Sequence, residues 1–223
     1  MRKTIITLLV ALPLCLTAQT KSATEQRIEA QGFVNVKDAD PSIKVSLMYT
    51  RPDNFTGKVL YTDLKEAYLH PLAAEALKKA QAELKRRRPE LSLIVYDATR
   101  PMSVQQKMWN VVKGTSKSIY VSNPANGGGL HNYGFAVDVS ICNEKGDTIP
   151  MGTIIDHLGR EAQPKLEAEM LSRGVISQKS LDNRRLLREV MAAGGYKVLN
   201  TEWWHFNLKT RKQVKAEGRK PIR

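Results

Sequence analysis

The sequence predicts a single α+β domain with a central antiparallel sheet flanked by helices. Two observations favour this class. Short segments whose apolar residues alternate or run together, typical of strands, are mixed with longer segments whose apolar residues recur every three or four positions, typical of helices. Their order shows no regular strand–helix–strand repeat of the kind that builds a parallel sheet. With 223 residues, the chain is long enough to bury one sizeable core.

The first residues are typical of a secretory signal peptide. Arg2 and Lys3 precede an apolar run over residues 5–16, and we predict cleavage after Ala18. The run is too short for a comfortable membrane span. We therefore expect an exported protein, periplasmic or extracytoplasmic, with no transmembrane segment in its mature form. Lipidation at Cys15 is disfavoured, because a leucine precedes it where a lipidated site needs a small side chain.

Short strands are expected in the first part of the mature chain. Residues 33–36 indicate one such strand. Residues 42–49 (SIKVSLMY) predict another, because Ile43, Val45 and Leu47 alternate onto one face.

A long helix and a buried strand come next. The helix begins at Pro71 and ends before Pro89. Its apolar positions recur at helical spacing: Ala73, Leu77, Ala80 and Leu84. The strand covers residues 92–96 (SLIVY), and Ser103 is placed to cap a further helix.

The second half of the chain places an aspartate inside an apolar strand. Residues 116–129 are rich in Ser, Asn, Pro and Gly and indicate a loop. The strand expected over residues 136–141 has three apolar residues on one face: Val137, Val139 and Ile141. Asp138 therefore points to the other face, where we expect it to be paired or bound to a metal. The last elements expected are a helix and a hairpin, over residues 180–193, 196–199 and 203–208.

Two segments supply side chains suited to a zinc site. They are residues 129–138 (GLHNYGFAVD) and residues 201–206 (TEWWHF). The first offers His131 and Asp138, and the second offers His205. Two imidazoles and one carboxylate can hold one Zn²⁺ per chain and leave its fourth position for water.

Glu202 remains free to act as a general base at such a site. It lies three residues before His205 in a segment that predicts a strand, where positions three apart face opposite ways. A bulge would let both side chains reach one site. Of the other histidines, His70 is expected at a helix start, and His157 is either a further ligand or exposed.

Arg100 has two interpretations. It follows the buried strand and precedes Pro101, so its backbone is well fixed. Its guanidinium would stabilise a tetrahedral oxyanion by about 3 kcal/mol, the scale of one oxyanion-hole donor. The alternative is a salt bridge to Asp97 or another acid, and position alone favours neither.

The net charge of +13 is concentrated in two places. Residues 85–88 (KRRR) are all basic, and residues 209–223 form a basic tail with seven basic side chains and one glutamate. The tail has no aromatic residues for stacking on bases, so no nucleic-acid partner is expected. Solvated charge near an anionic envelope surface is the favoured interpretation.

Several segments together resemble the zinc D-alanyl-D-alanine dipeptidases of the VanX type. In chain order they are YTRPDNFTG (49–57), DATRP (97–101), HNYGFAVD (131–138), MGTIID (151–156), NRRLLR (183–188) and EWWHF (202–206). The resemblance implies the zinc D-Ala-D-Ala peptidase fold, which is of the hedgehog and DD-peptidase type, over residues 19–208. It implies zinc on three ligands: His131, Asp138 and His205. It also implies Glu202 as general base and acid, and Arg100 as stabiliser of the transition state.

Two further assignments rest on the resemblance alone. It implies that Tyr49 and Asp156 hold the free ammonium group of a dipeptide; without it, Asp156 is interpreted as a helix N-cap. The family usually has a serine two residues before the first zinc histidine, whereas this chain has Gly129. Without that serine, one hydrogen bond to the substrate is lost, and a strict preference for D-Ala-D-Ala is not implied for this chain.

The predicted function is that of an exported zinc dipeptidase. Its substrate would be D-alanyl-D-alanine or a related small dipeptide, in peptidoglycan turnover or dipeptide scavenging. One alternative is a zinc D,D- or L,D-carboxypeptidase that trims peptidoglycan stem peptides, which needs an open cleft and no ammonium clamp. The other is a non-catalytic cell-wall binding module, which needs neither Glu202 nor Arg100.

Overall fold

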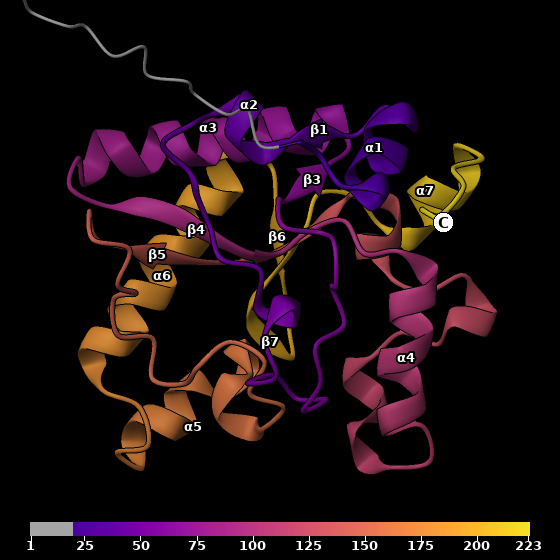
Figure 1. The fold of residues 1–223 in the computed structure, drawn as a ribbon. Helices are drawn as coiled ribbons and strands as arrows, with labels where there is room; N and C mark the ends of the chain where they lie inside the picture. The colour runs from indigo at the N-terminus through magenta and orange to yellow at the C-terminus, as the bar shows by residue number, and fades with distance from the viewer. Residues whose placement is uncertain (1–19) are drawn as a thin grey trace, which may run out of the picture.

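A five-stranded sheet runs through the middle of the molecule (Figure 1). The computed structural model describes residues 20–223, so the predicted signal peptide lies outside the described residues. The strand order is β2-β4-β5-β7-β6, with the bounds Lys44–Val45, Ser92–Asp97, Ala136–Cys142, Glu202–Asn207 and Lys197–Leu199. A separate small sheet pairs β1 (Val34–Asn35) with β3 (Tyr68–Leu69).

The main sheet is antiparallel except at one edge. β4, β5, β7 and β6 pair antiparallel in succession, as predicted, whereas β2 pairs parallel to β4. The prediction of an antiparallel sheet is therefore wrong for β2. Between β2 and β4 the chain makes a long crossover that includes β3 and a helix, and such a crossover is what a parallel pair requires.

Two long helices pack against each other beside the sheet, and both were predicted. They are α3 (Pro71–Arg87) and α6 (Gln178–Ala193), and α3 lies along β4 in Figure 1. His70 is the N-cap of α3: its Nδ1 accepts a hydrogen bond from the Leu72 N–H at 3.2 Å, which confirms its expected place at a helix start. The four predicted apolar positions of α3 are fully buried.

The remaining helices are shorter. They are α1 (Ala23–Ala30), α2 (Val36–Ala39), α4 (Met102–Val112), α5 (Glu167–Ser172) and α7 (Arg211–Ala216). Turns of 3-10 helix, η1 to η6, occupy Met48–Thr50, Ser116–Tyr120, Pro124–Asn126, Leu130–Tyr133, Arg160–Ala162 and Pro164–Leu166. Among the described residues, no helix is both long enough and apolar enough to cross a bilayer.

Three local predictions are wrong. The strand expected over residues 42–49 shrinks to β2 and is followed by η1. Val36 begins α2 instead of ending a strand, because the Asn35 side chain accepts a backbone hydrogen bond two residues on and caps a helical turn. Ser103 lies inside α4; Pro101 occupies the cap position, and no side chain bonds there.

β5 is the most buried strand of the sheet. All seven of its residues are buried, including Asp138 and Ser140 on the face opposite the apolar residues. The predicted apolar face of this strand is confirmed, since its three residues have no exposed surface. Asp138 is therefore a charged group inside the protein, which requires compensation by partners.

The basic tail packs onto the rest of the domain. Ile222 is fully buried, its N–H donates to the Asn132 carbonyl at 2.7 Å, and its carbonyl accepts from the Met102 N–H at 3.0 Å. The tail therefore joins the turn η4 to the start of α4. Lys209 pairs with Glu217, so part of the charge of the tail is neutralised within it.

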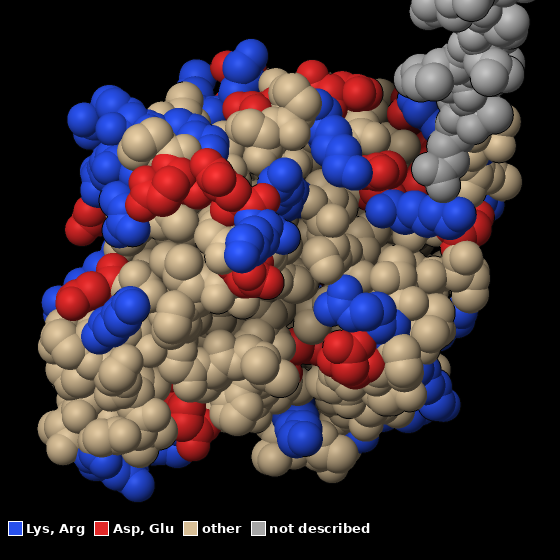
Figure 2. Space-filling model, turned by 60° about the vertical axis from the view of Figure 1, so that its left-hand side comes forward, with Lys and Arg blue, Asp and Glu red and all other residues tan. Residues whose placement is uncertain are grey.

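The second basic run is also paired at the surface. Its arginines bond acids on α3, α6 and the following loop, in the pairs Arg86–Glu83, Arg87–Glu83, Arg87–Glu189 and Arg88–Glu90. Figure 2 shows Lys and Arg interleaved with Asp and Glu over the visible face. Exposed pairs of this kind contribute little to stability. The mixed surface is consistent with the interpretation of solvated charge.

We predict that the tail contributes to the stability of the domain. Ile222→Ala should lower the free energy of unfolding by about 3 kcal/mol, because it leaves a cavity at a fully buried position. Denaturant unfolding of the mature chain measures this change. The matched control is Arg223→Ala at an exposed neighbour, and equal, small effects of the two changes would contradict the packing role.

Candidate active site

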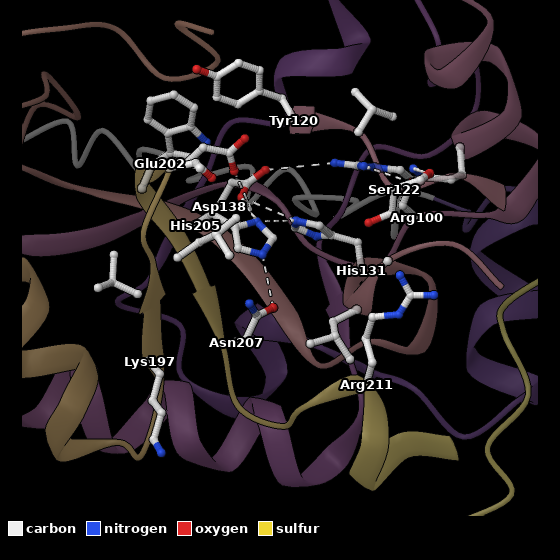
Figure 3. Close-up of a pocket in the computed structure, with 18 of the residues that line it drawn as sticks. Arg100, Tyr120, Ser122, His131, Asp138, Lys197, Glu202, His205, Asn207 and Arg211 are labelled. Carbon is white, nitrogen blue, oxygen red and sulfur yellow. Dashed lines mark hydrogen bonds and ion pairs between the residues drawn. The ribbon is translucent and has the colours of Figure 1, made fainter. Parts of the chain in front are cut away.

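Three side chains from distant parts of the sequence meet at one point (Figure 3). His131 comes from η4, Asp138 from β5 and His205 from β7, and the last two are direct partners in the β5–β7 ladder. His205 Nδ1 lies 2.9 Å from Asp138 Oδ1 and 3.2 Å from His131 Nε2. His131 Nε2 lies 3.3 Å from Asp138 Oδ1. The structure brings together the three residues that the sequence predicted as metal ligands.

The outer nitrogen of each imidazole bonds to an acceptor. His131 Nδ1 donates to the Ala98 carbonyl at 2.6 Å, and His205 Nε2 donates to Asn207 Oδ1 at 3.0 Å. In both rings the other nitrogen faces the Asp138 carboxylate, and in a neutral imidazole that nitrogen has a free lone pair. This is the outer-shell arrangement that orients histidine ligands at metal sites.

The spacing of the three inner atoms fits a divalent cation. Two ligands at about 2.0–2.1 Å from a tetrahedral zinc ion lie roughly 3.3 Å apart. The separations here are 2.9, 3.2 and 3.3 Å. Without a cation, three electron-rich atoms would face one another in a buried place. Two imidazoles and a carboxylate are also donors that zinc prefers, so the residues fit the ion.

Glu202 reaches the cluster through an irregularity in the last hairpin. Val198 pairs with Phe206, but the next residue of β6, Leu199, pairs with Glu202, so β7 has extra residues at this point. This is the bulge that the sequence required. Glu202 Oε2 lies 3.8 Å from His205 Nδ1. Burial raises the pKa of Glu202 to about 8, and a cation bound at the cluster would lower it again by favouring the carboxylate.

Arg100 forms the salt bridge to Asp97 that one of its two interpretations expects, and its side chain also lines the cavity. Its Nε donates to Asp97 Oδ2 at 3.0 Å, Nη2 bonds the same oxygen, and Nη1 donates to Gln105 Oε1 at 3.0 Å. The buried Asp97 also accepts a hydrogen bond from the Tyr61 hydroxyl at 2.5 Å. Arg100 Nη2 lies 3.9 Å from Asp138 Oδ2, so the guanidinium is fixed beside the cluster.

Tyr49 and Asp156 are in direct contact. The Tyr49 hydroxyl donates to Asp156 Oδ1 at 3.0 Å, and the Phe55 N–H donates to Oδ2 at 2.9 Å. Asp156 lies in a turn with φ at 68°, a left-handed conformation, so its interpretation as a helix N-cap is wrong. Burial raises the pKa of Asp156 to about 6, although both hydrogen bonds oppose the shift.

One cavity of about 650 Å³ joins these groups. It is lined by all seven side chains that the sequence singled out, namely Tyr49, Arg100, His131, Asp138, Asp156, Glu202 and His205. Its volume suits a small ligand. His157 does not join the cluster; its Nε2 lies 2.9 Å from Glu161 Oε2 at a partly exposed position.

Sequence reasoning missed three contributors to the site. Asn207 had a usable signal, because it lies two residues after His205 on a strand and therefore shares its face. Tyr61 had none, because it lies far from Asp97 in the sequence and reaches it only after folding. Gln105 follows Arg100 closely, near the start of α4, but nothing in the sequence shows that its side chain turns toward the guanidinium.

Comparison with known proteins identifies the family. The family model described as D-ala-D-ala dipeptidase matches residues 29–217. The chain belongs to this family. It is therefore a hydrolase of a metallopeptidase family.

Curated members of the dipeptidase family cover most of the chain. The D-alanyl-D-alanine dipeptidase of Escherichia coli K12 is 32% identical over 170 residues, which cover 75% of this chain and 80% of that protein. The enzyme of the same name from Enterococcus faecium is 24% identical over 200 residues, covering 80% of this chain and 92% of that protein. That from Enterococcus faecalis is 21% identical over 196 residues, covering 79% and 91%.

This chain has Gly129 at the position where the dipeptidase family usually has a serine, and the side chain of Ser122 lies in the space that a serine there would occupy. A Cβ added to Gly129 would lie 3.0 Å from Ser122 Oγ and 3.3 Å from Ser122 Cβ. Ser122 lines the cavity, and its carbonyl accepts a hydrogen bond from Gln105 Nε2 at 2.7 Å. Side chains at positions 122 and 129 therefore compete for one volume.

We predict that restoring the serine strains this loop. Gly129→Ser should lower the free energy of unfolding by about 1 kcal/mol, because its Cβ crowds Ser122 while the backbone, with φ at −110°, tolerates a side chain. In a double-mutant cycle by denaturant unfolding, Ser122→Gly should relieve that loss. Additive effects of the two changes would show that the positions do not compete.

Proposed function

We propose that this protein is an exported zinc dipeptidase that hydrolyses D-alanyl-D-alanine or a related small dipeptide with a free amino terminus. The observation that carries the proposal is the content of one cavity. It holds a three-ligand cluster, a buried glutamate beside it, a fixed guanidinium, and the Tyr49–Asp156 pair. The names of the relatives support D-alanyl-D-alanine as the substrate.

His131, Asp138 and His205 would hold the zinc ion. When bound there, zinc supplies a Lewis acid for the scissile carbonyl and lowers the pKa of water toward roughly 7. The carbonyl of Ala98 and the amide of Asn207 keep both imidazoles in the tautomer that ligation needs.

Glu202 would carry the proton in both halves of the reaction. Its carboxylate accepts a proton from the attacking water and then delivers it to the departing amine. Burial favours the second step, because it opposes the lowering of the Glu202 pKa by a bound cation and so keeps the protonated form accessible once the carboxylate has taken up the proton. Both steps depend on the bulge in β7, because it brings the Glu202 side chain into the same cavity as His205.

Arg100 would stabilise the oxyanion that forms as water adds to the peptide carbonyl. Asp97 and Gln105 hold its guanidinium on two sides, so it needs no reorganisation when negative charge develops. A donor placed in this way contributes about 3 kcal/mol to transition-state stabilisation.

Asp156 would bind the ammonium group of the substrate. Tyr49 and the Phe55 backbone fix its carboxylate, and a buried carboxylate in a small cavity favours a ligand that brings a positive charge. This pair supports a dipeptidase over a carboxypeptidase, whose substrate has no free ammonium near the scissile bond. A binding module without turnover would not need Glu202 or Arg100 in the cavity.

Export is proposed from the sequence of residues 1–18. An exported enzyme of this specificity would act in peptidoglycan turnover or in scavenging released dipeptides. Destruction of D-alanyl-D-alanine inside the cell would not require a signal peptide.

The zinc-loaded mature protein should release alanine from D-alanyl-D-alanine much faster than from the N-acetylated dipeptide. Glu202→Gln should lower kcat by roughly 10²–10⁴-fold with bound zinc unchanged, whereas His205→Ala should lose the ion. Alanine release and metal content are measured on the same samples. Equal or faster cleavage of the acetylated substrate would instead favour the carboxypeptidase. Full activity of Glu202→Gln would contradict the role of Glu202 as the proton carrier.

The affinity for a free dipeptide should follow the ionisation of Asp156. Its pKa of about 6 means that the carboxylate is charged above this pH and neutral below it. KM for D-alanyl-D-alanine should therefore rise as the pH falls from about 7 to about 5. In Asp156→Asn, KM should be at least tenfold higher, roughly 1.4 kcal/mol, and flat over the same range. A wild-type KM in the variant would contradict the clamp.

A further inference from the structure

α6 carries a fully buried arginine, Arg184, that the proposed chemistry does not use. Its Nε donates to the Met151 carbonyl at 2.6 Å, and its Nη1 donates to the Glu161 carbonyl at 3.0 Å. These two carbonyls lie at the ends of residues 151–161, here called the Asp156 loop. One side chain therefore bonds both ends of the loop that presents Asp156 to the cavity.

The burial of Arg184 is only partly compensated by acids. Arg184 Nη1 lies 3.5 Å from Glu167 Oε1, whereas Arg188 binds both oxygens of that carboxylate at 2.8 Å. Arg184 Nη2 is buried and has no hydrogen-bond partner among residues 20–223. A guanidinium in this position is costly to bury. The closest hydrogen bonds of Arg184 go to the two ends of the Asp156 loop. We therefore assign to this side chain the role of holding the loop in place.

Arg184 also connects the Asp156 loop to the strand that carries Glu202. Its guanidinium carbon lies 5.5 Å from the centroid of the Trp203 ring, a cation–π contact. Trp203 Nε1 donates to Thr153 Oγ1 at 2.8 Å, within the same loop. Because Trp203 directly follows Glu202 on β7, these contacts join the proposed ammonium site to the proposed base.

We propose that Arg184 is a positioning residue that fixes Asp156 relative to Glu202 and so restricts the cavity to free dipeptides. The inference rests on the function proposed above. In a dipeptide, the ammonium and the scissile carbonyl belong to the same residue and are separated by one α-carbon, so the ammonium nitrogen lies about 2.5 Å from the carbonyl carbon. A displacement of about 1 Å is enough to lower catalysis roughly 100-fold. The loop has little regular structure of its own, so its position depends on such external bonds.

Arg184→Met tests this with little change in side-chain volume. We expect kcat/KM for D-alanyl-D-alanine to fall at least tenfold, mainly through KM, while kcat/KM for the N-acetylated dipeptide and bound zinc stay within about threefold. Arg184→Lys, which keeps the charge and one donor, should recover part of the loss. The matched control is Arg185→Met, whose arginine is the exposed neighbour on the same helix. Equal losses on both substrates would overturn the proposal.

A second readout does not depend on substrate. Hydrogen exchange measured by mass spectrometry should become faster over residues 151–161 in Arg184→Met and stay unchanged in Arg185→Met. Unchanged exchange in that loop would overturn the proposal even if activity fell. If wild-type protein cleaved no dipeptide, the proposed function would fail while this readout still tested the role of Arg184. If Arg184→Met did not fold, Thr153→Val would replace it, because this change removes the hydrogen bond from Trp203. The variant should show a smaller fall in kcat/KM for the free dipeptide and a smaller rise in loop exchange. Wild-type kinetics and exchange in Thr153→Val would overturn the proposal.

Discussion

The pairing of β5 with β7 is the constraint on which the site depends. It sets Asp138 directly opposite His205, and η4 then delivers His131 to the same point. Side chains alternate along a strand, so a slip of one residue would turn Asp138 onto the apolar face and separate the ligands. The full burial of β5 on both faces opposes such a slip, because it would also expose or misplace Val137 and Val139.

Three carboxyl groups in and beside the cavity have different surroundings, and these surroundings give each of them a different role. Asp97 is fully buried against Arg100 and fixes that guanidinium. Asp156 receives two hydrogen bonds, yet burial still raises its pKa to about 6, and burial raises the pKa of Glu202 to about 8. Carboxyl groups with separated pKa values take different roles in one site. Here they provide an anchor for a guanidinium, a site for an ammonium and a carrier for a proton.

Sequence patterns predicted what depends on local periodicity and missed what depends on long-range contact. α3, β4, β5 and α6 were evident from spacing, and the three candidate ligands, which the structure brings together, were chosen for their donor chemistry. A strand was predicted over residues 42–49, but its short length and its parallel pairing with β4 were missed, because alternation along one segment does not show which strand it pairs with or in which direction. Tyr61 was missed because its hydrogen bond to Asp97 joins distant parts of the sequence, and Gln105 was missed because the sequence does not show the direction of its side chain. The packing of Ile222 was missed because it is one apolar residue in a strongly charged tail.

The central claim is that three lone pairs converge on a bound zinc ion. X-ray absorption at the zinc edge of the purified mature protein tests it most directly. The account predicts one zinc per chain with only nitrogen and oxygen ligands at about 2.0–2.1 Å, two of them imidazoles. It also predicts loss of the imidazole signal when His131 and His205 are replaced together. A spectrum with sulfur at about 2.3 Å, which would point to Cys142, or a protein that binds no zinc, would contradict it.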